Sequence, residues 1–348
     1  MSGPGQPYQL TKADNRRIFL ADIVPDQLAG REPQQEPTVV VLLGQQGAGK
    51  TRTSQAIAQR LNERGGFVDL DSDLYKPYHP RYAELMTEDD QLMALHVGPD
   101  AREWTHQART HALENRLNVL AHDTAGDARF SADLLPRYRQ AQYRVELVAL
   151  GVPRALSDQG VLNRYHEQVQ DRGQGRLSVP EKVAAAYTGM LDYADIVDAE
   201  QLADVVTVYR RGESKPRYLN VLEDGRWTRT PRFREALHET RNTPLTPQET
   251  ADFLRVQDKL RMEMAPEFQG HLDVISSQAA PLLHPGTVER WQSKPVRPSS
   301  AAARSRSTTR SDKPPAQQAP GGPSHGGSDQ TVSRRRPDDP DARRGRGR

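Results

Sequence analysis

The segment that decides the fold is Gly44-Gln45-Gln46-Gly47-Ala48-Gly49-Lys50-Thr51. It fits the pattern G-x-x-x-x-G-K-[ST] of a phosphate-binding P-loop. The uncharged, β-branched run at 38–43 just before it predicts a buried parallel strand. Residues 51–61 just after it carry apolar side chains on one helical face. A strand, a glycine-rich turn and a helix in this order are the context that the motif requires, so the segment predicts a nucleotide site.

Each residue type in this segment has a physical reason to be there. The glycines let the backbone curl so that successive N–H groups point at one phosphate group. The start of the following helix adds positive potential. Lys50 brings a mobile cation to the β- and γ-phosphates, and the Thr51 hydroxyl can ligate Mg²⁺. We therefore assign nucleotide binding to residues 44–51 and a metal contact to Thr51.

Strands and helices alternate over the first 200 residues. The sequence predicts strands at 38–43, 67–71, 117–121, 143–150 and 196–197, with helices at 51–61, 101–116, 131–142, 153–169 and 180–193. Such alternation implies parallel strands joined by right-handed crossovers. The predicted fold class is α/β, with a doubly wound, mostly parallel sheet that binds ligands at the carboxyl ends of its strands.

The pattern changes after residue 198. Residues 205–209 and 217–222 alternate around a turn and predict an antiparallel hairpin at the sheet edge. Thr246 and Glu249 form a capping-box pattern that opens a helix to about residue 264. We therefore divide the chain into an N-terminal arm and helical segment (1–36), a core (37–198), a hairpin and helical extension (199–293) and a tail (294–348).

The tail differs from the rest of the chain in charge and composition. Lys294–Arg348 holds 13 Lys and Arg against 5 Asp and Glu, whereas the other residues hold 35 against 41. The tail has no Trp, Phe, Tyr, Leu, Ile or Met. It cannot bury enough apolar surface to offset the entropy of ordering, so we expect it to be disordered. Contact with nucleic acid is expected only through this basic tail.

Composition also excludes several classes of protein. The chain has no cysteine, which rules out disulfides, Cys-ligated zinc and a thiol nucleophile. It has no apolar run near 18 residues, and its first residues lack the apolar core of a signal peptide. We expect a cytoplasmic protein with no membrane partner.

Polar side chains follow the second and third predicted strands. A carboxylate of Asp71-Ser72-Asp73 can take the proton of an acceptor hydroxyl, although an acidic Asx turn explains the same residues. In His122-Asp123-Thr124, Asp123 can lie near Mg²⁺ and Thr124 can hold a substrate, although strand-end capping is the alternative. Arg164 and Arg176 suit phosphate oxygens, and each also fits an ordinary surface arginine.

The order of these pieces, over about 160 residues, resembles the zeta-toxin family of toxin–antitoxin systems. The matching pieces are the glycine-rich segment, Asp71-Ser72-Asp73-Leu74-Tyr75, His79-Pro80-Arg81-Tyr82, His122-Asp123-Thr124, residues 145–150, Arg164-Tyr165 and Arg176. Members are P-loop kinases that are similar in fold to nucleoside and shikimate kinases. The resemblance therefore implies a sheet of the P-loop kinase type.

The resemblance also implies roles for individual residues. Lys50 binds the nucleotide phosphates, Thr51 binds Mg²⁺, and Asp73 is the general base. Thr124 contacts a sugar substrate, while Arg164 and Arg176 steady the transferring phosphoryl group. These assignments make Lys50, Asp73, Arg164 and Arg176 the candidate catalytic residues, with Asp123 as a second metal ligand.

The implied reaction is phosphorylation of UDP-N-acetylglucosamine by ATP or GTP at the 3′-hydroxyl of its amino sugar. A small helical antitoxin that blocks the nucleotide site is the implied protein partner. The family carries Glu-Gly-Thr where this chain has His122-Asp123-Thr124. The family's glutamate helps to hold the amino sugar, so His122 takes that substrate-binding position here, and another small hydroxyl compound is an alternative acceptor.

Two other function classes share the phosphate-binding segment. One is a P-loop ATPase or nucleotide switch that acts on a protein partner. The other is a polynucleotide kinase whose Arg-rich tail adds salt-dependent affinity for RNA or DNA. Against the second, the chain outside the tail is acidic, and no aromatic-basic interleaving marks a base-stacking surface.

Overall fold

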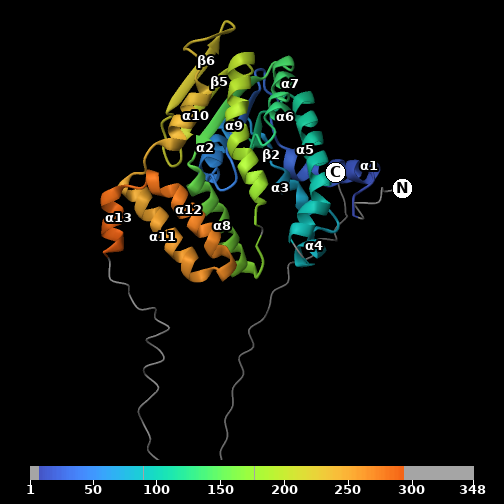
Figure 1. The fold of residues 1–348 in the computed structure, drawn as a ribbon. Helices are drawn as coiled ribbons and strands as arrows, with labels where there is room; N and C mark the ends of the chain where they lie inside the picture. Colours follow the sequence, from blue (N-terminus) through green and yellow to red (C-terminus); the bar gives the residue numbers. More distant parts are fainter. Residues whose placement is uncertain (1–7, 89, 176, 294–348) are drawn as a thin grey trace, which may run out of the picture. The chain divides into compact units, whose positions relative to one another are not determined.

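A mixed sheet forms the centre of the computed structural model, which describes residues 8–88, 90–175 and 177–293 (Figure 1). Within these residues the sheet has seven strands in the order β2-β3-β1-β4-β5-β6-β7. Their bounds are β1 Thr38–Leu43, β2 Val68–Leu70, β3 Val119–Asp123, β4 Arg144–Gly151, β5 Val205–Arg210, β6 Tyr218–Glu223 and β7 Arg226–Trp227. The predicted tail and Arg176 lie outside the described residues.

Strands β1 to β5 are parallel, and β6 and β7 are antiparallel. In the register, Leu70 is level with Ala121 and Leu43 is level with Asp123. The loops that follow β1, β2 and β3 therefore leave the sheet at the same edge. This arrangement confirms the predicted α/β class and the mostly parallel sheet.

The predicted strand at 196–197 is wrong. Both residues belong to the helix α9, Pro180–Glu200, where Val197 is fully buried in the same cluster as Tyr193 and Ala194. Burial on one helical face overrides the β preference of Ile196 and Val197. The fifth parallel strand is instead β5, the first strand of the predicted hairpin, which pairs with β4 on one side and with β6 on the other.

The remaining elements include the predicted helices with shifted ends. Before β3 they are α1 Lys12–Ile18, the π-helix η1 Phe19–Leu28, α2 Thr51–Asn62, α3 Ser72–Tyr75, η2 Lys76–Tyr78, α4 Tyr82–Glu88 and α5 Asp90–Glu114. Between β3 and β5 they are α6 Ala128–Ala132, α7 Leu135–Gln140, α8 Arg154–Arg172 and α9. The helix predicted at 101–116 begins earlier, at Asp90, and the sequence does not predict α3, η2 or α4. The single helix predicted at 131–142 is two helices, and Pro136 lies in the first turn of the second.

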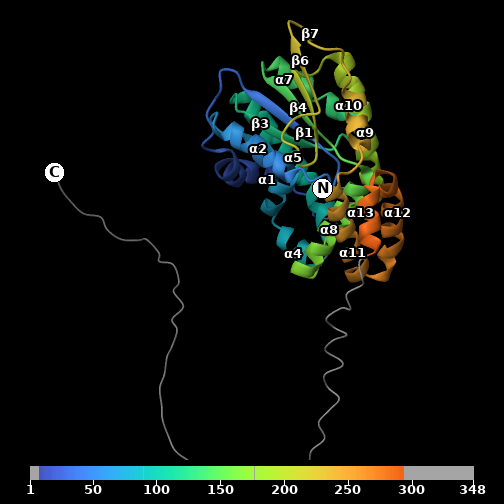
Figure 2. The ribbon, with the colours of Figure 1, turned by 90° about the vertical axis from the view of Figure 1, so that its left-hand side faces the viewer.

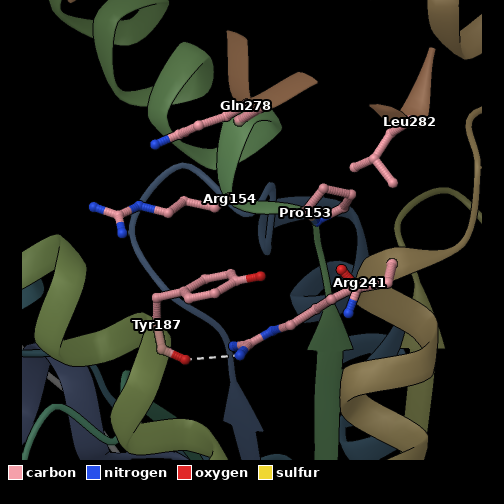
Figure 3. A pocket seen from close by; sticks show the side chains of 8 residues that line it. Pro153, Arg154, Tyr187, Arg241, Gln278 and Leu282 are labelled. Carbon is pink, nitrogen blue, oxygen red and sulfur yellow. Dashed lines mark hydrogen bonds between the residues drawn. The ribbon is translucent and has the colours of Figure 1, made fainter. Parts of the chain in front are cut away.

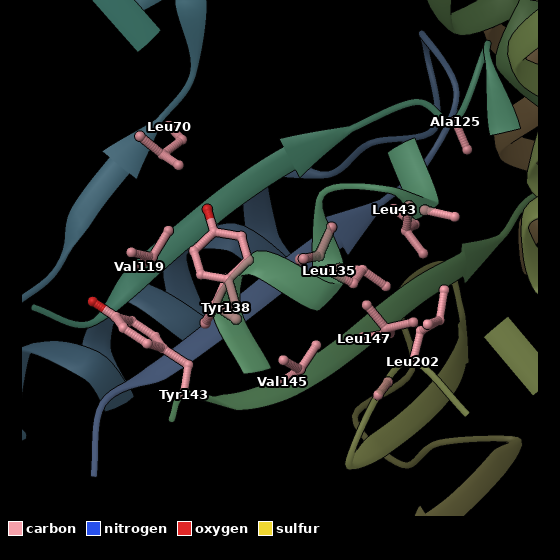
Figure 4. Packing of buried hydrophobic residues seen from close by; sticks show 14 of the residues in the cluster. Leu43, Leu70, Val119, Ala125, Leu135, Tyr138, Tyr143, Val145, Leu147 and Leu202 are labelled. Carbon is pink, nitrogen blue, oxygen red and sulfur yellow. The ribbon is translucent and has the colours of Figure 1, made fainter. Parts of the chain in front are cut away.

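Alternate side chains of β1 are buried on opposite faces of the sheet. Val39, Val41 and Leu43 pack with residues of α5, α7 and α9 in the larger core cluster, part of which is drawn in Figure 4. Val40 and Leu42 pack on the other face against α2. Fully burying one such side chain contributes roughly 1.5–3 kcal/mol. This two-sided burial explains why the run at 38–43 is apolar throughout rather than alternating.

A helical extension follows the sheet. It comprises α10 Phe233–Asn242, α11 Pro247–Glu263, η3 Pro266–Phe268, α12 Gln269–Ala279, η4 Ala280–Leu282 and α13 Pro285–Gln292. Its helix α10 packs against α9 and β5, and its helices α11 and α12 pack against α8. Figure 2 shows α11 and α12 beside α8, and the buried cluster between them joins Leu162 of α8 to Phe253, Leu260 and Ile275. The capping box of Thr246 and Glu249 is formed, as the sequence predicts.

Candidate active site

The glycine-rich segment runs from the end of β1 to the first residue of α2, Thr51. Gly47 and Gly49 have φ angles of +74° and +78°, which favour glycine. A Cβ on Gly47 would lie 2.0 Å from the Ser157 carbonyl oxygen in α8, and one on Gly49 would lie 3.1 Å from Arg211 Nε. The backbone conformation therefore favours glycine at both positions, and at Gly47 the backbone of α8 also leaves no room for a side chain.

Lys50 folds back across the loop. Its Nζ donates to the carbonyl oxygen of Gly44 at 2.5 Å and lies 3.4 Å from that of Gln45. Burial is the largest influence on Lys50 and lowers its pKa to about 8; the charges of Asp71 and Asp123 act in the opposite direction, and that of Arg164 adds to the lowering. The charges of these three side chains therefore act on the Lys50 ammonium.

Asp71 and Asp73 follow β2 at the same edge of the sheet as Lys50. Asp71 caps α3, because its Oδ1 accepts a hydrogen bond of 2.9 Å from the Asp73 backbone N–H. The exposed Asp73 carboxylate forms an ion pair with Lys76, whose side chain is largely buried. The hydrogen bond from the Asp73 N–H shows that Asp71 forms the turn that is the alternative to a catalytic role. The Asp73 side chain takes no part in this turn and is exposed.

His122 and Asp123, the last residues of β3, and Thr124 after them lie at the same sheet edge as Asp71 and Asp73. Asp123 Oδ1 accepts a hydrogen bond of 2.8 Å from the Ala125 N–H, and Ala125 has a φ angle of +50°. His122 Nε2 lies 3.1 Å from Asp69 Oδ1, without the alignment of a hydrogen bond. His122 is therefore turned toward β2. Thr124 lies between Asp123 and Ala125, the residue with the left-handed backbone conformation, at the carboxyl edge of the sheet.

Arg164 comes to the site from α8, where its Nη2 also donates to Ser178 Oγ at 3.1 Å. Lys50, Asp71 and Asp123 thus lie at the same edge of the sheet, with Asp73 in the adjacent turn of α3, and the charge of Arg164 acts on Lys50 from α8. Arg176 lies outside the described residues, so its role stays a prediction.

Two arginines that lie at the loop, Arg211 and Arg241, belong to no recognisable sequence motif. Arg211, which directly follows β5, places its guanidinium beside Gly49. Arg241 of α10 donates to the side chain of Gln45, with Nη2 3.4 Å from Oε1. The buried Gln45 amide in turn donates to the Val152 carbonyl oxygen at 3.0 Å and to Ser157 Oγ at 2.6 Å. The Gln45 side chain therefore anchors the loop to the start of α8.

A metal ion fits this site through few protein ligands. Among the described residues, no group of three or more His, Asp or Glu side chains is placed to hold a metal. Mg²⁺ commonly binds through one or two protein side chains, with phosphate oxygens and water completing its shell. The Thr51 hydroxyl at the start of α2 and the Asp123 carboxylate at the end of β3 are donors of that kind.

The family model for zeta toxin matches residues 24–223, more than half of the chain. The chain belongs to the zeta-toxin family. Toxin zeta of Enterococcus hirae is 23% identical over 163 residues, which are 47% of this chain and 56% of that relative. Toxin PezT of Streptococcus pneumoniae is 25% identical over 194 residues, or 53% of this chain and 73% of that relative. This zeta-toxin family member thus spans little more than half the length of the first relative.

A solved structure shares the fold. The toxin–antitoxin system PezAT of Streptococcus pneumoniae contains a chain with a TM-score of 0.59 and 19% identity, matched over 72% of this chain and 96% of that one. The zeta-toxin match ends at the last residue of β6, so α10 to α13 lie beyond it. Within the described residues, no helix has the length and apolar character to span a membrane.

Proposed function

We propose that this zeta-toxin family member is a kinase that transfers the γ-phosphoryl group of ATP or GTP to a hydroxyl group of a sugar nucleotide, with UDP-N-acetylglucosamine as the first acceptor to test. The observation that carries the proposal is the glycine-rich loop with its Lys50 ammonium, at the sheet edge where Asp71 follows β2 and Asp123 ends β3. Family membership supports the same reading.

The loop amides and Lys50 hold the nucleotide phosphates in this proposal. The carbonyl oxygens that Lys50 contacts would give way to phosphate oxygens, which bind an ammonium more strongly. Thr51 and Asp123 would hold Mg²⁺, which when bound neutralises charge on the β- and γ-phosphates. Because ATP is the donor, we propose that the reaction takes place in the cytoplasm.

Asp73 acts as the general base. It takes the proton of the acceptor hydroxyl as that oxygen bonds to the γ-phosphorus, while the bond from the γ-phosphorus to the bridging oxygen breaks and the nucleoside diphosphate leaves. Lys76 orients the Asp73 carboxylate through their ion pair. Arg164 stabilises charge on the transferring group, and we assign the same role to Arg176.

Thr124 and His122 are the proposed acceptor contacts. The imidazole of His122 is directed toward Asp69, so we expect Thr124 to make the closer contact with the sugar. We also propose an antitoxin partner that covers the nucleotide site, since the neighbour of known structure comes from a toxin–antitoxin system.

The test is whether nucleoside diphosphate release depends on an acceptor. We expect release from ATP to rise at least about tenfold when UDP-N-acetylglucosamine or another true acceptor is added. Incubating the full chain with labelled ATP and a metabolite extract, followed by mass spectrometry, would name the acceptor. Equal release with and without every acceptor would refute the kinase and favour an ATPase.

Arg211→Ala is expected to raise the KM for ATP by about five- to tenfold with little change in kcat, because the guanidinium beside Gly49 is placed to contact the bound nucleotide. Initial rates at varied ATP concentration measure the effect. Arg226→Ala, at the other end of the hairpin, is the matched control and should keep the KM of the unaltered chain. An unchanged KM in Arg211→Ala would remove Arg211 from the nucleotide site.

A further inference from the structure

A cavity lies where the helical extension meets the start of α8. It has a volume of about 250 Å³, and Figure 3 shows its walls from α8, α9, α10, α12 and η4. Two of its lining residues, Arg154 and Arg241, are arginines, and none of its lining residues is Asp or Glu. The walls of this cavity are therefore positively charged.

Arg241 is the unusual member of this wall. Its side chain is almost fully buried, with 1% of the residue exposed. Nη1 donates to the Tyr187 carbonyl oxygen at 2.7 Å, and the guanidinium lies 4.0 Å from the centre of the Tyr187 ring. Its Nε is buried with no hydrogen-bond partner. Among the residues that the structure describes, no carboxylate lies within ion-pair distance of this guanidinium.

A buried cation without a counter-ion is costly. Desolvation disfavours the charged form, and burial accordingly lowers the pKa of Arg241 to about 10. The ring of Tyr187 and neutral acceptors offset only part of this cost. An anion from solution would supply the missing opposite charge.

The other walls of the cavity also suit an anion. The cavity opens at the start of α8, a helix of 19 residues whose first N–H groups and dipole favour negative charge. Arg154 lies in that first turn, half exposed and 3.4 Å from Asp158. Gln278 lines the cavity from α12, and the N–H group of its amide can donate to an anion.

The size of the cavity limits the ligand. Pockets for drug-sized molecules occupy about 300–1,000 Å³, so about 250 Å³ is too small for a whole nucleotide. We propose that this cavity is an anion site, which takes the phosphate or carboxylate group of a small molecule between Arg154, Arg241 and the start of α8. It does not use Lys50, although Arg241 also contacts Gln45 of the glycine-rich loop. Its α10 and α12 walls lie beyond the zeta-toxin match, and the proposal does not depend on kinase activity.

The experiment must separate this site from the glycine-rich loop. We would use the full chain carrying Lys50→Ala, which weakens phosphate binding at the loop, and titrate inorganic phosphate at constant ionic strength maintained with sodium chloride. Calorimetry should still detect phosphate binding. Adding Arg154→Ala should weaken that binding about tenfold. Arg172→Ala, an equal loss of charge at the other end of α8, is the matched control and should leave it unchanged.

A second variant and a second anion complete the experiment. Arg241→Lys keeps the charge but loses the planar fork, and it should also weaken phosphate binding in protein whose circular dichroism spectrum is unaltered. A parallel titration with sodium acetate distinguishes a carboxylate ligand from a phosphate ligand. Equal anion binding with and without Arg154→Ala, or no binding of either anion in the Lys50→Ala chain, would overturn the proposal.

Discussion

Asp73→Asn is expected to abolish phosphoryl transfer while ATP still binds. The asparagine keeps the size of the side chain and its place in α3 but cannot accept the hydroxyl proton. Loss of a general base typically lowers kcat by about 10²–10⁴-fold. Because Asp73 belongs to α3 rather than to the glycine-rich loop, the Kd for ATP should stay close to its original value. Acceptor-dependent ADP release measures transfer, and calorimetry measures binding.

Asp71→Asn is the control for this result. Asparagine also caps helices, so the hydrogen bond from the Asp73 N–H can persist in that variant. It removes a negative charge near Lys50 without removing the proposed base, and we expect it to retain most of the transfer activity. If Asp73→Asn transferred phosphate at the original rate while Asp71→Asn did not, the base would have to be reassigned to Asp71.

Lys50→Ala is expected to impair both nucleotide binding and transfer. It removes the cation from the loop, where we place the β- and γ-phosphates, so kcat/KM should fall on the order of 10²–10³-fold and the Kd for ATP should rise about tenfold or more. Lys12→Ala, an exposed lysine on α1, should change neither value. Wild-type affinity for ATP in Lys50→Ala would contradict the assignment of the loop.

The lowered pKa of Lys50 adds a pH dependence to this prediction. With its pKa at about 8, the free protein loses the Lys50 proton as the pH rises above that value. Bound triphosphate favours the charged ammonium, so ATP binding above pH 8 should take up a proton, and affinity should fall by up to about tenfold per pH unit. Calorimetry in two buffers of different ionisation enthalpy detects this uptake, which should be absent in Lys50→Ala.

The sequence predicts those parts of the site that follow from local pattern and parallel topology. The β-branched run at 38–43 and the glycines after it fix the loop, and parallel pairing places the residues after β2 and β3 at the same edge. The strand predicted at Ile196 and Val197 is wrong because β-branched residues suit both a strand and the buried face of a helix. The catalytic roles of Asp73, Thr124 and Arg164 stay predictions.

Arg211 and Arg241 escape prediction for a different reason. Each reaches the glycine-rich loop from a distant part of the chain, and no local pattern marks an arginine for such a contact. The consecutive arginines Arg210 and Arg211, at the end of β5 and the carboxyl edge of the sheet, are the available signal for Arg211. No comparable signal marks Arg241, because its contact with Gln45 depends on how α10 packs in the folded protein.

The hydrogen bond between Gln45 and Arg241 joins residues 196 positions apart. A ribosome that adds about 5–20 residues per second needs roughly 10–40 s to make the intervening chain. During that interval the nascent polypeptide has its glycine-rich loop but lacks the arginine that holds Gln45. The phosphate-binding loop therefore gains its contact with Arg241 only after α10 has left the exit tunnel, although Val152 and Ser157 can hold Gln45 earlier.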